Sequence, residues 1–304
     1  MTKEMVRDKG LNRVPMTLGE RAMHILLAED GSMDVAAAVE LIQDLSLSRD
    51  TKIIVMSVIA PADKPNYKVR QDTLDQTTDL LKKLYINIIP IIEYGDPAEK
   101  LLEYALQHTP NLIVLGANGL RQALGIPLGG AAQKVIEQVR SPVMVMRHPY
   151  RRVNRVLLLT DGSSQSQYAS QYLAEFPIPT SIEIEVLHVL PPISYDQAIA
   201  QSWEKDPKSS DINYEPEDDA AISKAMKILK VHNRNAKAVL IRGDPINEIM
   251  RYIKDRGIDL TVAGARGLTK GKKWELGSIS RKLVHFCGCS MLIVKDRRDW
   301  STRN

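Results

Sequence analysis

Hydrophobic and polar positions along the chain form one series of patterns that occurs twice. Short apolar runs, typical of buried strands, alternate with longer amphipathic segments, typical of helices. Alternating strands and helices, with several strands apolar throughout, predict an α/β fold with a parallel sheet covered on both faces. The clearest apolar runs are 24–28, 53–58, 112–115 and 143–146 in the first half, and 156–159, 184–189, 260–263 and 291–294 in the second.

The turns between these segments repeat as well. The first strand of each half ends in Asp-Gly-Ser, and the third ends in Gly-Asp-Pro. Because Pro is favoured in the first turn of a helix behind an Asp cap, the Gly-Asp-Pro turns predict helices over 97–108 and 245–255. Capping fully explains Asp96 and Asp244, and we assign them no chemistry.

The repeat also predicts how the chain is divided. A chain of 304 residues is long enough for about two domains of roughly 150 residues each. The second copy carries an insertion rich in Pro and charged residues over 191–219, which is typical of a surface loop. We expect a flexible N-terminus over 1–20, a first domain over 21–148, a second domain over 152–296 and a tail over 297–304.

Composition excludes several classes of function. The net charge of +4 is small and only 5% of residues are aromatic, so we expect no nucleic-acid partner. The first 20 residues lack the apolar run of a signal peptide, and no stretch approaches the roughly 20 apolar residues of a membrane span. We therefore expect no membrane association and a cytoplasmic location.

The residues that commonly bind metals show no ligand spacing. The six histidines are scattered, and we interpret His188 as structural. Cys287 and Cys289 are the only cysteines, so no disulfide framework is expected and the chain fits a reducing compartment. They precede the last apolar run, where we interpret them as small packing residues at a helix-to-strand junction in preference to a metal or redox site.

The strongest chemical signal is a glycine pattern after the fourth strand of each half. In the second half, Gly264 and Gly267 are followed, after nine residues, by Gly277 and Ser278. Glycines let the backbone turn so that N–H groups converge on an anion, and the later glycine opens a helix whose N-terminus favours phosphate. The spacing matches neither the Gly-x-Gly-x-x-Gly fingerprint nor the P-loop. The first half has the same spacing at Gly116, Gly119, Gly129 and Gly130.

Together with the Asp-Gly-Ser that ends the first strand, this pattern resembles the ATP-binding subclass of the universal stress protein family. The resemblance covers about 23–295, twice over. It implies two tandem Rossmann-like domains of the adenine nucleotide α-hydrolase-like type, each a five-stranded parallel sheet in the order 3-2-1-4-5. It further implies that the last strands of the two halves pair as an intramolecular pseudo-dimer, and that two chains can form a homodimer.

The resemblance also implies a ligand and its site. The ligand is ATP accompanied by Mg²⁺, with ADP, AMP or a cyclic nucleotide left open. In the second half, the adenosine end lies at Asp161 and the backbone near Val189. Ribose and phosphates lie at Gly264, Arg266, Gly267, Gly277, Ser278 and Ser280. The equivalents in the first half are Asp30, Val58, Gly116, Asn118, Gly119, Gly129 and Gly130.

The two halves differ in their hydroxyl groups. Gly130 replaces Ser278, and Ala132 stands where the second half has Ser280. Because a charge-assisted hydrogen bond to phosphate is worth roughly 1.5–3 kcal/mol, we predict that the second site binds a triphosphate more tightly. Three further basic residues either reach the γ-phosphate or form a solvated loop: Lys270, Lys272 and Lys273.

Neither half supplies a nucleophile with a base that the sequence can pair to it. Ser32 and Ser163 follow Asp-Gly and do not form a Gly-x-Ser-x-Gly nucleophile elbow. We therefore predict a nucleotide-binding stress-response or regulatory module with an unidentified protein partner, no catalytic residue and at most slow ATP hydrolysis. The alternatives are an ATP-dependent enzyme of the adenine nucleotide α-hydrolase type and a scaffold in which the nucleotide is purely structural.

Overall fold

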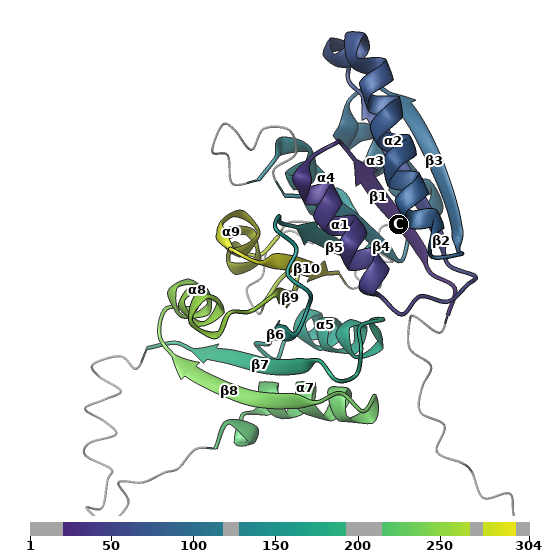
Figure 1. Cartoon of the computed structure of the whole chain (residues 1–304). Helices are drawn as coiled ribbons and strands as arrows, with labels where there is room; N and C mark the ends of the chain where they lie inside the picture. The colour runs from purple at the N-terminus through teal and green to yellow at the C-terminus, as the bar shows by residue number, and fades with distance from the viewer. Residues whose placement is uncertain (1–20, 118–127, 193–214, 268–275, 296–304) are drawn as a thin grey trace, which may run out of the picture.

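The computed structural model describes residues 21–117, 128–192, 215–267 and 276–295. These ranges contain the strands and helices of both copies of the repeat (Figure 1). The sequence predictions that fall outside them are the N-terminus, the C-terminal tail, most of the 191–219 insertion, Asn118, Gly119, Lys270, Lys272 and Lys273.

The first copy alternates strands with helices, as the hydrophobic pattern predicts. The Gly-Asp-Pro turn begins a helix at the expected residue, since Pro97 lies in its first turn and the Asp96 carboxylate accepts a hydrogen bond from the Glu99 N–H at 3.0 Å. The elements are β1 (His24–Glu29), α1 (Met33–Asp44), β2 (Lys52–Ile59), the 3-10 helix η1 (Pro61–Asn66), α2 (Tyr67–Lys82), β3 (Asn87–Tyr94), α3 (Pro97–His108), β4 (Leu112–Gly116), α4 (Gly130–Gln138) and β5 (Val143–Met146).

The second copy repeats this order. Asp244 caps the helix that follows the third strand of this copy, since its carboxylate accepts a 3.0 Å hydrogen bond from the Asn247 N–H. Gly257, with a φ of 60°, ends the same helix. The elements are β6 (Arg155–Leu159), α5 (Ser164–Glu175), β7 (Glu183–Leu190), the 3-10 helix η3 (Pro216–Asp218), α7 (Ala220–Val231), β8 (Ala236–Arg242), α8 (Pro245–Arg256), β9 (Leu260–Gly264), α9 (Ser278–Phe286) and β10 (Ser290–Val294).

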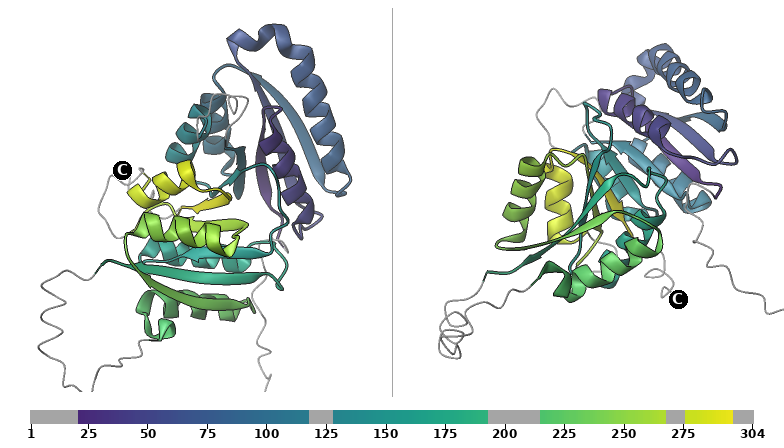
Figure 2. Two further views of the ribbon diagram at one scale, coloured as in Figure 1. Left: turned by 60° about the vertical axis from the view of Figure 1, so that its left-hand side comes forward. Right: turned by 60° about the horizontal axis from the view of Figure 1, so that its bottom comes forward.

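The strands of both domains form one ten-stranded sheet in the order β3-β2-β1-β4-β5-β10-β9-β6-β7-β8. Within each domain the pairing is parallel and follows the predicted order 3-2-1-4-5. The domains meet where β5 and β10 pair antiparallel, with Met144 opposite Leu292. The predicted intramolecular pairing of the last strands is therefore present, and Figure 2 shows the sheet continuing between the domains.

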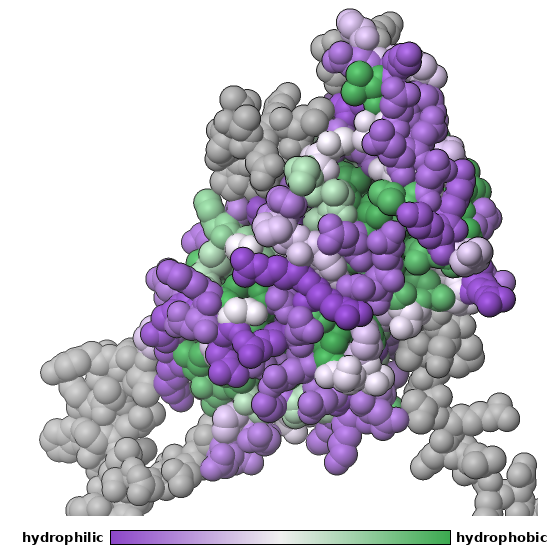
Figure 3. All heavy atoms as spheres, viewed as in Figure 1, coloured by the Kyte–Doolittle hydropathy of each residue, from purple (hydrophilic) through white to green (hydrophobic). Residues whose placement is uncertain are grey.

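Within the described ranges, four helices cover each face of the sheet, which explains the apolar runs. Alternate residues of β1 belong to different core clusters, Ile25 and Leu27 to one and Leu26 to the other. The first cluster packs against α1, α2, α5 and α7, and the second against α3, α4, α8 and α9. Because side chains alternate across a strand, a strand buried on both faces must be apolar at every position. The outward surface of α2, in contrast, is mostly hydrophilic (Figure 3).

In each domain, a positively charged side chain donates hydrogen bonds to the C-terminal end of a helix in the other domain. The Lys295 ammonium, just after β10, donates to the Ile136, Glu137 and Val139 carbonyls at the end of α4, at 2.5, 3.1 and 2.9 Å. The Arg147 guanidinium, just after β5, donates to the last turn of α9. Such contacts satisfy carbonyls that a helix terminus leaves without partners. Within the described residues, none of the helices has the length and apolar character that a membrane crossing requires.

Candidate functional site

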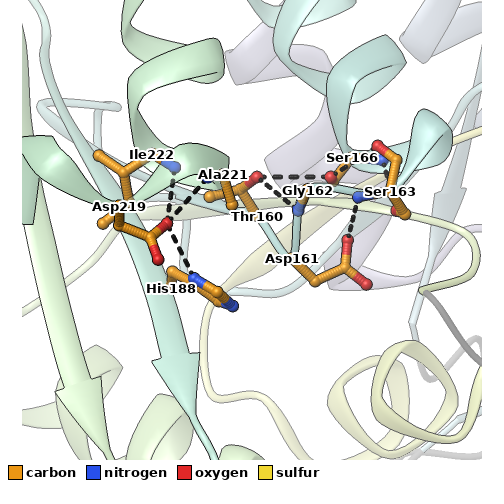
Figure 4. A network of polar contacts seen from close by, with 9 residues as sticks. All are labelled: Thr160, Asp161, Gly162, Ser163, Ser166, His188, Asp219, Ala221 and Ile222. Atoms are coloured by element: carbon orange, nitrogen blue, oxygen red, sulfur yellow. Dashed lines mark hydrogen bonds and ion pairs between the residues drawn. The ribbon is translucent and has the colours of Figure 1, made fainter.

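The Asp-Gly-Ser segment of the second domain is the turn that joins β6 to α5. Asp161 Oδ1 accepts a hydrogen bond from the Ser163 N–H at 3.0 Å, and Gly162 has a φ of 77°, a left-handed conformation that favours glycine. Ser163 Oγ then caps α5 by accepting from the Ser166 N–H at 3.2 Å. Figure 4 shows this turn at the carboxyl end of the strand. Ser163 is thus a helix cap.

The glycine loop after β9 lies directly against this turn. A Cβ atom added to Gly267 would lie 2.4 Å from Asp161 Oδ2, so a larger residue would collide with the carboxylate. A Cβ added to Gly277 would lie 3.3 Å from the Arg266 Cα and 3.6 Å from the Gly267 N. The structure therefore brings together four of the predicted site residues, and glycine at two of them keeps the backbones in close approach.

The start of α9 is tied to the end of β9 by hydrogen bonds. The Gly277 N–H donates to the Ala265 carbonyl at 2.9 Å, and Ser280 Oγ donates to the Gly264 carbonyl at 2.8 Å. Ser280 is buried, and Ser278 is exposed in the first turn. The first N–H groups of a helix have no partner within it, so this end of α9 offers donors beside the glycine loop. Ser280 positions that end, and its direct contact with phosphate stays a prediction.

A polar pair on the second strand of this domain was not anticipated as part of the site. His188 Nδ1 lies 3.0 Å from Asp219 Oδ1, the same oxygen that accepts from the Ala221 and Ile222 N–H groups at the start of α7. Figure 4 places this group beside the Asp161 turn. The sequence signals only the Asp219 cap, because the 31-residue separation from His188 carries no local pattern.

Val189 follows His188 on the same strand. It lies two residues beyond Leu187, the last residue of β7 that pairs with β6, and is therefore level with Asp161. Its side chain is partly buried against the core of the α8 and α9 face. The position agrees with the strand-end site, while its contact with an adenosine stays a prediction.

The equivalent turn in the first domain has the same backbone but different side chains. Asp30 Oδ1 accepts from the Ser32 N–H at 2.9 Å, and Gly31 has the same φ of 77° as Gly162. Glu29, however, is buried, and its carboxylate accepts from the Gly31 N–H and from Thr77 Oγ1, each at 2.6 Å. Burial raises the pKa of Glu29, and these two hydrogen bonds oppose the rise.

The remaining first-domain residues keep the glycine geometry. The Gly129 N–H donates to the Ala117 carbonyl at 2.8 Å, as Gly277 does in the second domain, whereas a Cβ on Gly130 would meet nothing within 4 Å. A Cβ on Gly116 would lie 2.9 Å from the Asp34 Cβ, which packs α1 onto β4. Val58 is buried one residue beyond the last β1–β2 pair. Asn118 and Gly119 lie outside the described residues.

The donor set fits a phosphorylated ligand better than a resident metal ion. Within the described ranges, no group of three or more His, Cys, Asp or Glu side chains could hold a metal. The second domain instead combines the Gly267 and Gly277 backbone with a helix N-terminus, both of which suit an anion. Magnesium would then arrive with a nucleotide, held mainly by its phosphates.

Comparison with known proteins matches both copies of the repeat. The model of the universal stress protein family matches residues 22–147 and 152–295. Universal stress protein YxiE of Bacillus subtilis is 26% identical over 155 residues, which are 47% of this chain and 99% of that protein. Universal stress protein Slr1230 of Synechocystis is 23% identical over 176 residues, and the match covers 57% of this chain and about half, 54%, of that protein.

A solved structure shows the same two-domain arrangement. The crystal structure of a universal stress protein from Archaeoglobus fulgidus is similar over 90% of this chain and 98% of its own, with a TM-score of 0.63 and 17% identity. That likeness shows the fold, and the family model matches nearly all of both repeats. The chain therefore belongs to the universal stress protein family, with two domains of that family in tandem.

Proposed function

We propose that the chain is an ATP-binding regulatory module of the stress response, in which the second domain holds the stronger site and turnover is slow at most. One observation carries the proposal. Asp161, Gly267 and Gly277 converge from three segments at one sheet edge, and a Cβ at Gly267 would displace the Asp161 carboxylate. Ligands of open parallel sheets bind at such carboxyl edges.

The number of carboxylates near each turn supports tighter triphosphate binding in the second domain. The first-domain turn, 29–34, contains Glu29, Asp30 and Asp34, whereas the equivalent turn, 160–165, contains Asp161 alone. A triphosphate carries several negative charges, so the additional carboxylates oppose its binding in the first domain. In the regulatory role, bound nucleotide would stabilise one arrangement of the glycine loops, which a protein partner distinguishes from the free form.

The first experiment identifies what the protein carries. Protein purified without added nucleotide is denatured, and the released small molecules are identified by chromatography and mass spectrometry. One adenine nucleotide per chain is the expected result. If nothing is released, calorimetric titrations with ATP, AMP and cyclic AMP in the presence of Mg²⁺ follow, and no binding at millimolar ATP would overturn the proposal.

Two matched glycine variants locate the site. Gly267→Ala places a methyl group against the Asp161 carboxylate, while Gly130→Ala places one in open space. We expect Gly267→Ala to lose the nucleotide and Gly130→Ala to retain it, with both proteins folded by circular dichroism. Equal nucleotide content in the two variants would contradict the assignment to the second domain.

A further inference from the structure

Outside the nucleotide site, the two cysteines form a close pair at the joint between α9 and β10. Their Sγ atoms lie 3.2 Å apart, and Thr261 Oγ1 lies 3.2 Å from the Cys289 Sγ. Cys287 is buried at the end of α9, where its N–H donates to the Leu283 carbonyl at 2.8 Å. The sulfur atoms need to approach by only about 1.2 Å to reach disulfide bonding distance.

The surroundings favour a thiolate on this pair. The hydrogen bond from the Cys289 thiol lowers the pKa of Cys287, with smaller contributions from Thr261 and the Arg147 guanidinium. The pKa of Cys289 is raised in turn, because its proton is held between the two sulfur atoms. Arg147 is fixed beside them by its bonds to the Val284 and His285 carbonyls, at 2.7 and 3.3 Å. Cationic neighbours of this kind activate cysteines.

A small oxidant has a route to the pair. A cavity of about 130 Å³ lies at the junction of the two domains, lined by Arg147, His148, Asp259, Gly288 and Cys289 among others. Cys289 is only half-buried. Cys289 lines the cavity and is in contact with the Cys287 sulfur, so the sulfur pair lies at the cavity wall.

We propose that Cys287 and Cys289 are a reversible dithiol–disulfide site oxidised by hydroperoxides, in place of the packing role that the sequence alone suggests. The thiolate that the pair shares attacks a peroxide oxygen, the O–O bond breaks, and the departing hydroxide takes a proton to form water. The second sulfur then attacks the sulfenic acid, and its thiol proton leaves with the displaced hydroxide as a second water. Two thiols and one hydrogen peroxide thus give one disulfide and two waters.

The test uses the full chain, whose only thiols are these two. The protein is reduced, freed of reductant, treated with hydrogen peroxide and measured by intact mass and by alkylation under denaturing conditions. We expect the mass to fall by two hydrogen atoms and both thiols to disappear, with full recovery after dithiothreitol. Thiols that remain free, oxygen atoms on Cys287 or Cys289 in the peptide masses, or a disulfide-linked dimer of chains would overturn the proposal; oxygen atoms on the 11 methionines do not bear on it.

Two variants test whether the disulfide requires both cysteines, one by removing a thiol and one by changing a nearby residue only. Cys287→Ser leaves Cys289 without its partner, so oxidation should add oxygen atoms to Cys289 or link chains, without the loss of two hydrogens from a monomeric chain. Phe286→Leu serves as the matched control, because Phe286 is exposed at the end of the same helix and is not among the residues that line the cavity. It should form the disulfide like the parent protein. A loss of two hydrogens from monomeric Cys287→Ser would contradict the assignment.

Discussion

The strand-end turns of the two domains share a backbone and differ in their polar groups. In the first domain, Glu29 is buried opposite Ser57, whose hydroxyl has no hydrogen-bond partner within the described residues. The second domain has Thr160 and His188 at the equivalent positions, and Asp219 binds the histidine. The two domains share the hydrogen bonds of the Asp-Gly-Ser turn and differ in the groups around it. Fold conservation alone therefore does not make two sites equivalent.

The N-terminal ends of α4 and α9 also differ in their polar groups, and again the second domain has the additional one. Ser280 Oγ binds the Gly264 carbonyl in the second domain, while Ala132 has no hydroxyl to do so in the first. Both domains have the hydrogen bond from the glycine before the helix to the preceding loop: Gly277 donates to the Ala265 carbonyl, and Gly129 donates to the Ala117 carbonyl. The second domain thus holds its cradle with one additional bond, in line with the stronger site that we propose for it.

The largest expected effect is on ATP affinity, when a side chain is introduced at the glycine that precedes α9 or at the glycine that precedes α4. Gly277→Val pushes a side chain into the Arg266 backbone, so we expect ATP to bind about 100-fold more weakly, roughly 3 kcal/mol. Gly129→Val, in the first domain, should change the dissociation constant less than about threefold by calorimetry. The opposite order would reverse the comparison between the domains.

The next largest effect is on the free energy of unfolding, when the cation that binds a helix end of the other domain is removed. Lys295→Met leaves the carbonyls at the end of α4 without their partner, and Arg147→Met does the same for α9. Losing such buried partners costs about 1–3 kcal/mol, and we expect the larger loss for Lys295, which binds three carbonyls. Urea unfolding measures both, and equal losses would show that the two helix ends depend on their cations alike.

Removing the additional hydroxyl tests the helix-start difference. Ser280→Ala should reduce the free energy of unfolding by about 1 kcal/mol, because the Gly264 carbonyl loses its donor. If Ser280 only positions α9, ATP affinity should fall less than about fivefold. A fall as large as that of Gly277→Val would instead indicate direct contact with the phosphates.

The smallest effect concerns the buried acid of the first domain. Because burial raises the pKa of Glu29, the folded state favours the protonated form; its contribution to stability is fully present below pH 4.5 and is lost as pH rises through the folded pKa. Glu29→Gln should therefore gain stability over the parent as pH rises from about 4.5 to 7. Urea unfolding at a series of pH values measures the gain, and a pH-independent difference would contradict the assignment.

Much of the fold followed from local pattern. The alternation of strands and helices, the helix beginning at Pro97 and the cap at Asp96 were predicted because caps, turns and apolar runs act over a few residues. The strand order was an expectation from the family resemblance, and the sheet has that order. Asp161 and the Gly267 loop lie together in the structure, after β6 and β9 respectively. The nucleotide contacts themselves remain predictions.

Other features had no local signal. The His188–Asp219 contact and the burial of Glu29 against Thr77 join residues 31 and 48 positions apart. The packing role first assigned to Cys287 and Cys289 did not include Arg147, which approaches from the other domain. Side-chain partners across such separations depend on how helices lie on the sheet, which periodicity does not encode.

The sequence by itself determined the repeat, the α/β class and the position of the glycine loops, because each depends on periodicity and on backbone conformations that few residues adopt. Only the tertiary structure decided which cation caps which helix, which carboxylate is buried and which groups surround the thiols. Those outcomes arise where β5 meets β10 and helices pack on the sheet. There, long-range packing sets both the distances between charges and the water that remains to solvate them.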